Sequence, residues 1–290
     1  MPSLRLTRSR FDRPGRRAGV VLALTAVLAV LVAAVAPAAA PRHATARRCR
    51  LTVTTVARGQ HAPDDLAIDG SRILVSDIKA NTLGVVRGGH VATLMSGLGG
   101  PEGIIVRSPT RLELAAQSTN QILSVDLHRH TTSVLAQLPT VPGQSGLDSI
   151  EAAPGGDTWA PDSANGVVYR LHRGHLRAVA GGFVRPVDVR GWAGGIAVAD
   201  EYGSWVYLQT GSRRIKLAKI LLPDDLAVLD GHLLATGQTG QLWEVAPHRR
   251  LLTGRLKYPQ GMVADGPGTV LVSEQSANRI VRVSGLTGCL

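Results

Sequence analysis

A short phrase returns six times along this chain and constrains its architecture more than any other feature. Its first copy is Pro63-Asp64-Asp65-Leu66, a proline and two acidic residues that lead into an apolar run. The six copies start at Pro63, Pro101, Gly146, Pro186, Pro223 and Pro259, which are 38, 45, 40, 37 and 36 residues apart. A period of roughly 40 residues with strand-like content is typical of an array of small β-sheets, most simply a β-propeller.

Each repeat contains four short apolar runs separated by turn residues. In the first repeat these runs cover residues 66–68, 73–76, 82–86 and 91–95. Asp69-Gly70 and Gly88-Gly89 lie between them, and such pairs favour tight turns between strands. Because no helix-period run appears after residue 40, we predict an all-β domain, a six-bladed β-propeller, over residues 51–290.

Two motifs in the last repeat carry a resemblance to known propellers. They are Pro259-Gln260-Gly261-Met262 and the later turn Ser276-Ala277-Asn278-Arg279-Ile280. With them the chain resembles the NHL-repeat propellers and, more loosely, the senescence-marker/gluconolactonase (SMP-30-like) and paraoxonase group. The resemblance covers residues 51–290. Motifs of this kind indicate architecture more than activity, because one fold hosts many functions.

The two ends of the predicted propeller complement one another. The last repeat stops after its third strand, and residues 51–59 read like the missing fourth strand. We therefore predict that the N-terminal strand completes the last blade, which removes the open sheet edges. Cys49 and Cys289, the only two cysteines, flank the two strands that would pair. A disulfide between them is expected in an exported chain; the alternative is two free thiols near the chain ends.

The first 40 residues have the pattern of an export signal. An Arg-rich start precedes 23 uncharged residues, 18–40, that end in Ala-Pro-Ala-Ala-Ala. A signal peptide is the favoured interpretation, and an uncleaved membrane anchor is the alternative. Residues 41–50 form a short linker. The chain is thus predicted to be secreted or extracytoplasmic, in contact with a membrane only if the leader is uncleaved.

The positive charge of the chain is concentrated in this leader. The formal net charge is +11, but residues 1–48 carry nine Arg and one Asp, which leaves only +3 for residues 49–290. A nearly balanced domain without a basic block argues against nucleic-acid binding.

The repeated phrases place acidic residues around one mouth of the predicted channel. In a propeller the first strand of each blade lines the channel, so the phrases that begin these strands form a ring. Clustered carboxylates need raised pKa values, a bound cation or hydrogen bonds from backbone N–H groups. The ring contains Asp64, Asp65, Glu102, Asp148, Asp188, Asp224 and Asp225.

The resemblance implies a Ca²⁺ ion in this mouth, because gluconolactonase-like and paraoxonase-like enzymes hold a metal there. By that resemblance Asp64, Glu102 and Asp224 are the candidate ligands. Those enzymes use Asn at some of these positions, where this chain has Leu147, Val187 and Gln260. The alternative is that Asp65, Asp148, Asp188 and Asp225 bond the backbone of neighbouring blades. A general base, if present, is predicted to be His61 or a ring carboxylate such as Asp224.

Two functions follow from the sequence. The first is an exported propeller that binds a protein, peptide or glycan on the mouth face, without catalysis. The alternative is a Ca²⁺-dependent lactonase or esterase, in which the metal polarises the ester carbonyl. Whether the chain is an enzyme stays open at this point.

Overall fold

A computed structural model describes residues 49–290, the part of the chain considered below. The chain divides into two units, Met1–Thr45 and Ala46–Leu290. The predicted signal peptide or anchor, residues 1–40, and residues 41–48 of the predicted linker lie outside the described residues. In the described part, no helix has the length and apolar character needed to cross a membrane.

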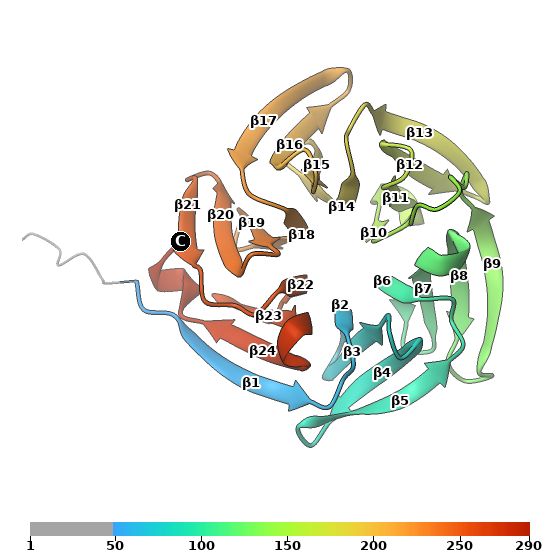
Figure 1. Cartoon of the computed structure of the whole chain (residues 1–290), viewed down its shortest axis with the longest axis horizontal. Helices are drawn as coiled ribbons and strands as arrows, with labels where there is room; N and C mark the ends of the chain where they lie inside the picture. Colours follow the sequence, from blue (N-terminus) through green and yellow to red (C-terminus); the bar gives the residue numbers. More distant parts are fainter. Residues whose placement is uncertain (1–48) are drawn as a thin grey trace, which may run out of the picture. The chain divides into compact units, whose positions relative to one another are not determined.

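The second unit is an all-β propeller whose sheets are arranged around a common centre, with one strand of each sheet near the centre and another along the circumference (Figure 1). Four sheets have four strands each, in chain order from the inside outward. The first is β6 (Pro101–Ser108), β7 (Arg111–Ala116), β8 (Gln121–Asp126) and β9 (Thr131–Gln137). The second is β10 (Glu151–Ala152), β11 (Thr158–Asp162), β12 (Val167–His172) and β13 (His175–Gly181). The third is β14 (Pro186–Trp192), β15 (Gly195–Asp200), β16 (Trp205–Thr210) and β17 (Arg213–Lys219). The fourth is β18 (Pro223–Leu229), β19 (His232–Gly237), β20 (Gln241–Ala246) and β21 (Arg250–Thr253).

The remaining strands form one eight-stranded sheet. Its members are β2 (Pro63–Asp69), β3 (Arg72–Asp77), β4 (Thr82–Arg87), β5 (His90–Ser96), β1 (Thr52–Arg58), β24 (Arg279–Ser284), β23 (Thr269–Glu274) and β22 (Pro259–Ala264), in that spatial order. The two halves meet at a single parallel pair between β1 and β5, Arg58 with His90. Four short 3₁₀ helices cover Gln117–Thr119, Pro154–Gly156, Gln275–Ala277 and Leu286–Gly288.

The apolar core is divided between successive groups of strands. It forms six clusters, and each spans two groups that are neighbours around the ring. Leu74 of β3 and Leu114 of β7, for example, are fully buried in one cluster. Val75 of β3 and Leu271 of β23 share another cluster, although both strands belong to the eight-stranded sheet. The two halves of that sheet therefore pack against each other and do not form one continuous layer.

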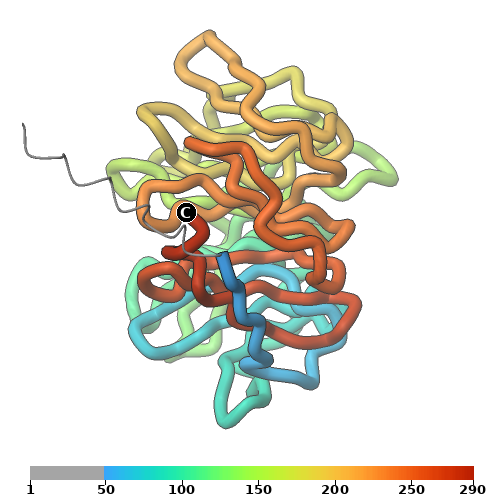
Figure 2. The backbone as a smooth tube through the Cα atoms, turned by 90° about the vertical axis from the view of Figure 1, so that its left-hand side faces the viewer, coloured from blue at the N-terminus to red at the C-terminus, as the bar shows by residue number. Residues whose placement is uncertain are grey.

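The chain ends meet as predicted. β1 pairs antiparallel with β24, from Thr52 opposite Ser284 to Arg58 opposite Arg279. Figure 2 shows this first strand lying against the last segments of the chain. The predicted disulfide is confirmed: Cys49 and Cys289 are bonded, with 4.6 Å between their Cα atoms. It closes a loop of 240 residues around the whole propeller, and structural disulfides are typical of oxidising, extracytoplasmic compartments.

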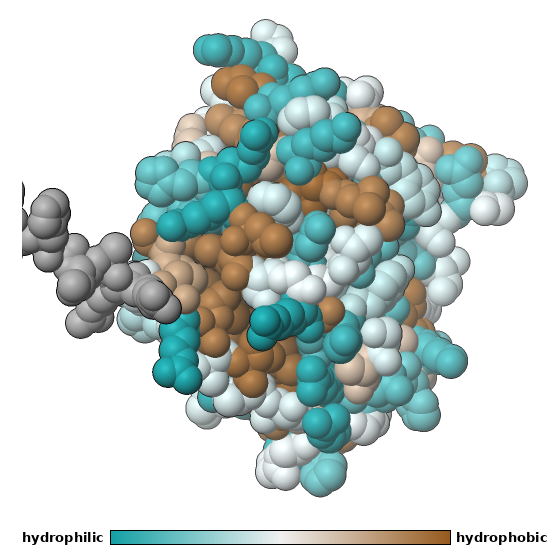
Figure 3. All heavy atoms as spheres, turned by 60° about the vertical axis from the view of Figure 1, so that its left-hand side comes forward, coloured by the Kyte–Doolittle hydropathy of each residue, from teal (hydrophilic) through white to brown (hydrophobic). Residues whose placement is uncertain are grey.

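The outer strands differ from the inner ones in exposure. The inner strand β6 is buried over its first five residues, whereas the outer strand β9 exposes its first four. One outer side of the molecule shows apolar side chains scattered among polar ones (Figure 3), which is ordinary for a protein surface. The inward-facing start of each inner strand is therefore the part of the fold that is both polar and enclosed.

Candidate functional site

A small polar cavity lies where the inner strands begin. Its volume is about 80 Å³. The seven acidic residues of the predicted ring line it, together with Gln260 from the last phrase: Asp64, Asp65, Glu102, Asp148, Asp188, Asp224, Asp225 and Gln260. The cavity is called the mouth pocket below. His61, the other candidate base, is not among the lining residues, and its side chain is exposed.

The third copy of the phrase begins one residue later than the sequence suggested. Leu147 pairs with Asp162, just as Pro63 pairs with Asp77 and Pro101 with Ala116. Asp148 is therefore the residue in the second place of the four-residue phrase, equivalent to Asp64, and Ser149 is in the third place, equivalent to Asp65. This copy has no proline to mark its start, which is why the sequence left its alignment one residue off.

An irregularity in the ladder follows the start of each inner strand that begins with proline. In β2, for example, regular pairing stops at Pro63 and resumes at Leu66. Such bulges re-aim the side chains of the intervening residues. The second and third residues of the phrase consequently serve different purposes, although they are adjacent in sequence.

Aspartates in the third place bond the backbone of the next inner strand. Asp65 accepts a hydrogen bond of 3.1 Å from the N–H of Ile104. Asp188 accepts one of 2.9 Å from the N–H of Leu226, and Asp225 accepts one from the N–H of Met262. The predicted alternative, that these carboxylates bond the backbone of neighbouring blades, is thus confirmed for Asp65, Asp188 and Asp225. It is wrong for Asp148, whose carboxylate accepts hydrogen bonds from the side chains of Gln117, Ser163 and Arg185.

Glycine takes the third place where two inner strands approach most closely. A Cβ atom on Gly103 would lie 2.4 Å from the backbone nitrogen of Ile150, and one on Gly261 would lie 2.4 Å from the backbone oxygen of Asp64. Both distances are far below van der Waals contact. The third place of the phrase therefore either bridges to the next strand or leaves room for it.

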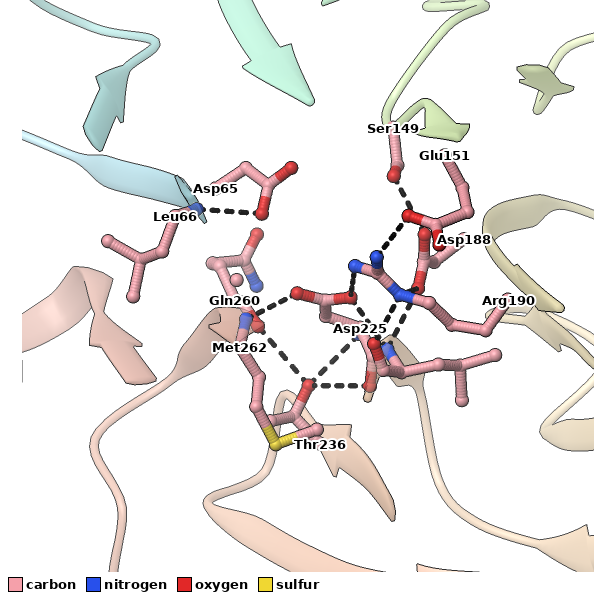
Figure 4. Close-up of polar contacts among 12 residues, drawn as sticks. Asp65, Leu66, Ser149, Glu151, Asp188, Arg190, Asp225, Thr236, Gln260 and Met262 are labelled. Atoms are coloured by element: carbon pink, nitrogen blue, oxygen red, sulfur yellow. Dashed lines mark hydrogen bonds and ion pairs between the residues drawn. The ribbon is translucent and has the colours of Figure 1, made fainter. Parts of the chain in front are cut away.

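One arginine neutralises the bridging carboxylates (Figure 4). Arg190 lies at 3.5 Å from Asp188 and 3.2 Å from Asp225, and it also pairs with Glu151. Its Nε donates to the backbone oxygen of Leu226 at 2.6 Å. Burial by itself would lower the pKa of Arg190, but the surrounding carboxylates raise it well above its ordinary value. This network joins neighbouring inner strands, although burial still raises the pKa of Asp65 to about 7 and raises that of Asp225.

Three carboxylates in the second place of the phrase, those of Asp64, Glu102 and Asp224, accept fewer hydrogen bonds than those in the third place. Asp64 accepts one side-chain hydrogen bond, from Gln275 at 3.1 Å, and Asp224 accepts one from Gln238 at 3.0 Å. Glu102 is 4% exposed, and no donor among the described residues bonds its carboxylate. Burial raises the pKa of Glu102 well above its usual range, and the charges of Asp64, Asp148 and Asp224 raise it further. Burial and the charge of Asp224 do the same for the pKa of Asp64.

Asp148 occupies a different environment on the same ring. Arg185 pairs with it at 2.7 Å and also pairs with Glu201. Ser163 donates a hydrogen bond of 2.7 Å to the same carboxylate oxygen, Oδ2, and the side-chain amide of Gln117 donates to the other oxygen, Oδ1. Burial raises the pKa of Asp148 to about 6, against the lowering effect of Arg185. A carboxyl group that titrates near neutral pH is suited to general acid–base catalysis.

The ring contains carboxylate and amide side chains, whose oxygen atoms are the ligands that a hard divalent cation prefers. Ca²⁺ prefers carboxylate and amide oxygens, and three carboxylates with spare lone pairs repel one another here without a neutralising arginine of their own. Within residues 49–290, however, no group of three or more His, Cys, Asp or Glu side chains is already arranged to hold a metal ion. Binding would therefore require these side chains to turn toward a common point.

Sequence reasoning missed the two arginines of the site. Arg190 stands two residues after Asp188 on the inner strand β14, so both side chains project to the same side of the strand. Arg185 directly precedes Pro186. A basic residue two positions after an acidic one on the same inner strand was the signal that could have revealed Arg190.

Comparisons with known proteins place this fold among solved propellers. No model of a known protein family matches the chain, and no curated protein gives a significant match. A gluconolactonase from Xanthomonas campestris has a TM-score of 0.67 and 16% identity, over 82% of this chain and 91% of that one. A calcium-binding regucalcin from Agrobacterium tumefaciens has a TM-score of 0.64 and 11% identity, over 77% and 90%. A virginiamycin B lyase from Staphylococcus aureus has a TM-score of 0.59 and 14% identity, over 80% and 84%. At these identities the likeness shows the fold alone: this chain has the β-propeller fold of gluconolactonase-like proteins and of virginiamycin B lyase.

Proposed function

We propose that this chain is a divalent-cation-dependent hydrolase that opens a lactone or small ester at the mouth pocket. One observation carries the proposal. Glu102 is a buried carboxylate without a hydrogen-bond donor among the described residues, and it faces Asp64 and Asp224 across one small cavity. Burial and the neighbouring carboxylates favour the protonated form of such a group, and a bound cation would keep it ionised, which gives this arrangement a physical reason.

The proposed cation is Ca²⁺, held by Asp64, Glu102 and Asp224. The calcium-binding regucalcin among the similar structures supports this choice. When bound, such an ion would polarise an ester carbonyl and make a water molecule more acidic. The metal ligands remain a proposal that rests on the chemistry of the three side chains.

The chain's own residues supply the other functions that the reaction needs. Asp148, with its pKa raised by burial to about 6, is the proposed general base. Arg185 holds Asp148 in place through its ion pair. Gln117 and Gln238 line the pocket and present amide groups that can orient a substrate oxygen.

We further propose that the eight-stranded sheet represents two blades, which gives the predicted six-bladed propeller of the NHL or SMP-30 kind. The single pair between β1 and β5 and the apolar cluster between the two halves support this count. We also propose that the domain is secreted, after export by the leader, in line with its disulfide.

The sequence also predicted a non-catalytic face for a protein, peptide or glycan. We favour the hydrolase because the polar groups converge in an enclosed cavity of about 80 Å³ and do not spread over a flat surface of the size that protein partners need.

The test is a lactone hydrolysis assay on protein stripped of metal and then reloaded. We expect hydrolysis of δ-valerolactone with Ca²⁺, none after chelation, and a loss of at least roughly a hundredfold in Glu102→Gln. Val187→Ala is the matched control, because Val187 takes the second place of its phrase but has no charge. Unchanged hydrolysis after chelation would overturn the proposal.

A further inference from the structure

The mouth pocket is too small for a whole substrate. Its volume is about 80 Å³, while pockets that enclose small ligands usually measure about 300–1,000 Å³. A cavity of this size has room for the reacting group alone. The remainder of any substrate must therefore lie against the residues that surround the opening.

The rim of this opening is built from six equivalent backbone contacts. In each, the residue just before the phrase accepts a hydrogen bond from the residue just after the second strand, such as Arg185 from Glu201 at 2.8 Å and Tyr258 from Gln275 at 3.1 Å. The six residues that precede the phrases differ in size between the two halves of the rim. Ala62, Gly100 and Gly146 on one half are small, whereas Arg185, Leu222 and Tyr258 on the other half have large side chains.

Tyr258 connects the rim to the pocket. Its hydroxyl donates to Gln238 at 3.1 Å, and Gln238 in turn donates to Asp224 at 3.0 Å. Tyr258 as a whole is 42% exposed. Its backbone has φ +53°, a left-handed conformation that Gly100 adopts at the equivalent place with φ +69°. Because glycine takes up this conformation without strain, the aromatic side chain is present at a conformational cost.

Tyr202 is the second aromatic ring on this half of the rim. It is 63% exposed, and the guanidinium of Arg185 lies 5.3 Å from its ring centre. Arg185 lines the mouth pocket. Each tyrosine therefore contacts a side chain that lines the pocket, and each is exposed to solvent.

We propose that the substrate carries an aromatic ring, or a comparably flat apolar group, next to its reacting carbonyl, and that Tyr202 and Tyr258 hold this group at the rim. This inference rests on the proposed function for the reacting carbonyl. It predicts that a phenyl-substituted δ-lactone is preferred over both δ-valerolactone and the polyhydroxylated glucono-δ-lactone.

The experiment compares kcat/KM for 5-phenyl-δ-valerolactone and δ-valerolactone in the calcium-loaded full domain. Stacking on one aromatic ring corresponds to roughly a threefold to tenfold change in affinity. Tyr202→Ala and Tyr258→Ala should each lower the phenyl-to-unsubstituted ratio by this factor, through KM. Tyr258→Phe keeps the ring and should retain most of the preference. Leu251→Ala, which removes an exposed apolar side chain from β21, should leave the ratio unchanged.

A second measurement separates this inference from the proposed function. Binding of the corresponding phenyl-substituted lactam, which is not hydrolysed, is followed by calorimetry in the same variants. Hydrolysis of δ-valerolactone without a phenyl preference, and without an effect of either Tyr→Ala change, overturns the inference alone. If no lactone is hydrolysed, the proposed function fails; lactam binding weakened by both changes still supports the rim site, and lactam binding that is absent or unaffected overturns it.

Discussion

The carboxylate of Asp65 accepts a hydrogen bond from the backbone N–H of Ile104, 3.1 Å away on the neighbouring inner strand. Asp64, its neighbour in sequence, also lines the mouth pocket, but its carboxylate accepts a hydrogen bond from the side chain of Gln275 and none from a neighbouring inner strand. The same division separates Asp225, which bonds the N–H of Met262, from Asp224. Adjacent acidic residues of one repeated phrase thus have two distinct functions, of which one stabilises the ring and the other forms the proposed site.

Replacing Asp225 by alanine should destabilise the domain strongly. The change leaves the N–H of Met262 without its acceptor and removes one of the charges around the buried Arg190. Breaking a buried, hydrogen-bonded charge pair typically costs about 3–5 kcal/mol of unfolding free energy. Urea denaturation of the metal-free protein measures it.

Asp224→Ala is the matched control, one residue away. It removes a single hydrogen bond from Gln238 together with a repelled charge, so it should change the unfolding free energy by less than about 1 kcal/mol. Equal losses in the two variants would show that the proposed division between ring and site is incorrect.

The stability of the metal-free protein should fall as the pH rises from about 4 to 7. The pKa of Asp148 is raised from 3.8 to about 6 by burial, and burial also raises that of Glu102. A carboxyl whose pKa is raised on folding contributes stability that is fully present below its unfolded pKa and is lost as the pH rises through its folded pKa. Thermal melts of wild type and of Asp148→Asn measure the effect, and the variant should show a shallower decline. A melting temperature that rises equally in both proteins over this range would contradict the prediction.

The pH profile of hydrolysis should identify Asp148 as the base. In the calcium-loaded wild type the charge of the ion should lower the pKa of Asp148 below the value of about 6 that burial gives it in the metal-free site, so kcat/KM should rise with an apparent pKa below 6. Asp148→Asn should remove this rise, the acid limb of the pH profile, and lower kcat by roughly a hundredfold or more. Ser163→Ala serves as the comparison: it removes one donor to Asp148, so the limb should persist and move to higher pH. A limb that stays in Asp148→Asn assigns the base to another residue.

The disulfide should contribute substantially to stability. Cys49→Ser together with Cys289→Ser opens a loop of 240 residues, and losing such a bond typically costs about 2–5 kcal/mol. Denaturation of the double variant, beside wild type under non-reducing conditions, measures the loss. The strand β1 should then detach first, so faster amide exchange in Thr52–Arg58 than in β23 is the expected signature.

Much of the fold could be predicted from the sequence, because the constraints that define it are local and repeated. The proline phrase recurs at a regular period. An extra strand precedes the first repeat, and the last repeat lacks its fourth strand. These features led to the propeller, to the pairing of β1 with β24 and to the bond between Cys49 and Cys289.

The site could be predicted only in outline. The sequence placed the acidic residues at one mouth, but it could not show which of two adjacent aspartates bonds the neighbouring inner strand, because the bulge in the strand decides this. It also misaligned the third phrase, where Leu147 replaces proline, and it did not reveal the pairing of Arg185 with Asp148. The ion pair between Arg185 and Asp148 joins residues from different repeats, and the sequence has no local signal for such a contact.

Calorimetric titration of the metal-free domain with CaCl₂ at pH 7 tests the central proposal most directly. We predict one Ca²⁺ bound per chain in wild type, with a rise in melting temperature on saturation. Binding should weaken at least tenfold in Glu102→Gln, which keeps the shape of the side chain and removes its charge, and should persist in Val187→Ala. No heat of binding and no shift of the melting temperature in wild type, or equal binding in Glu102→Gln, would contradict a cation site in the mouth pocket.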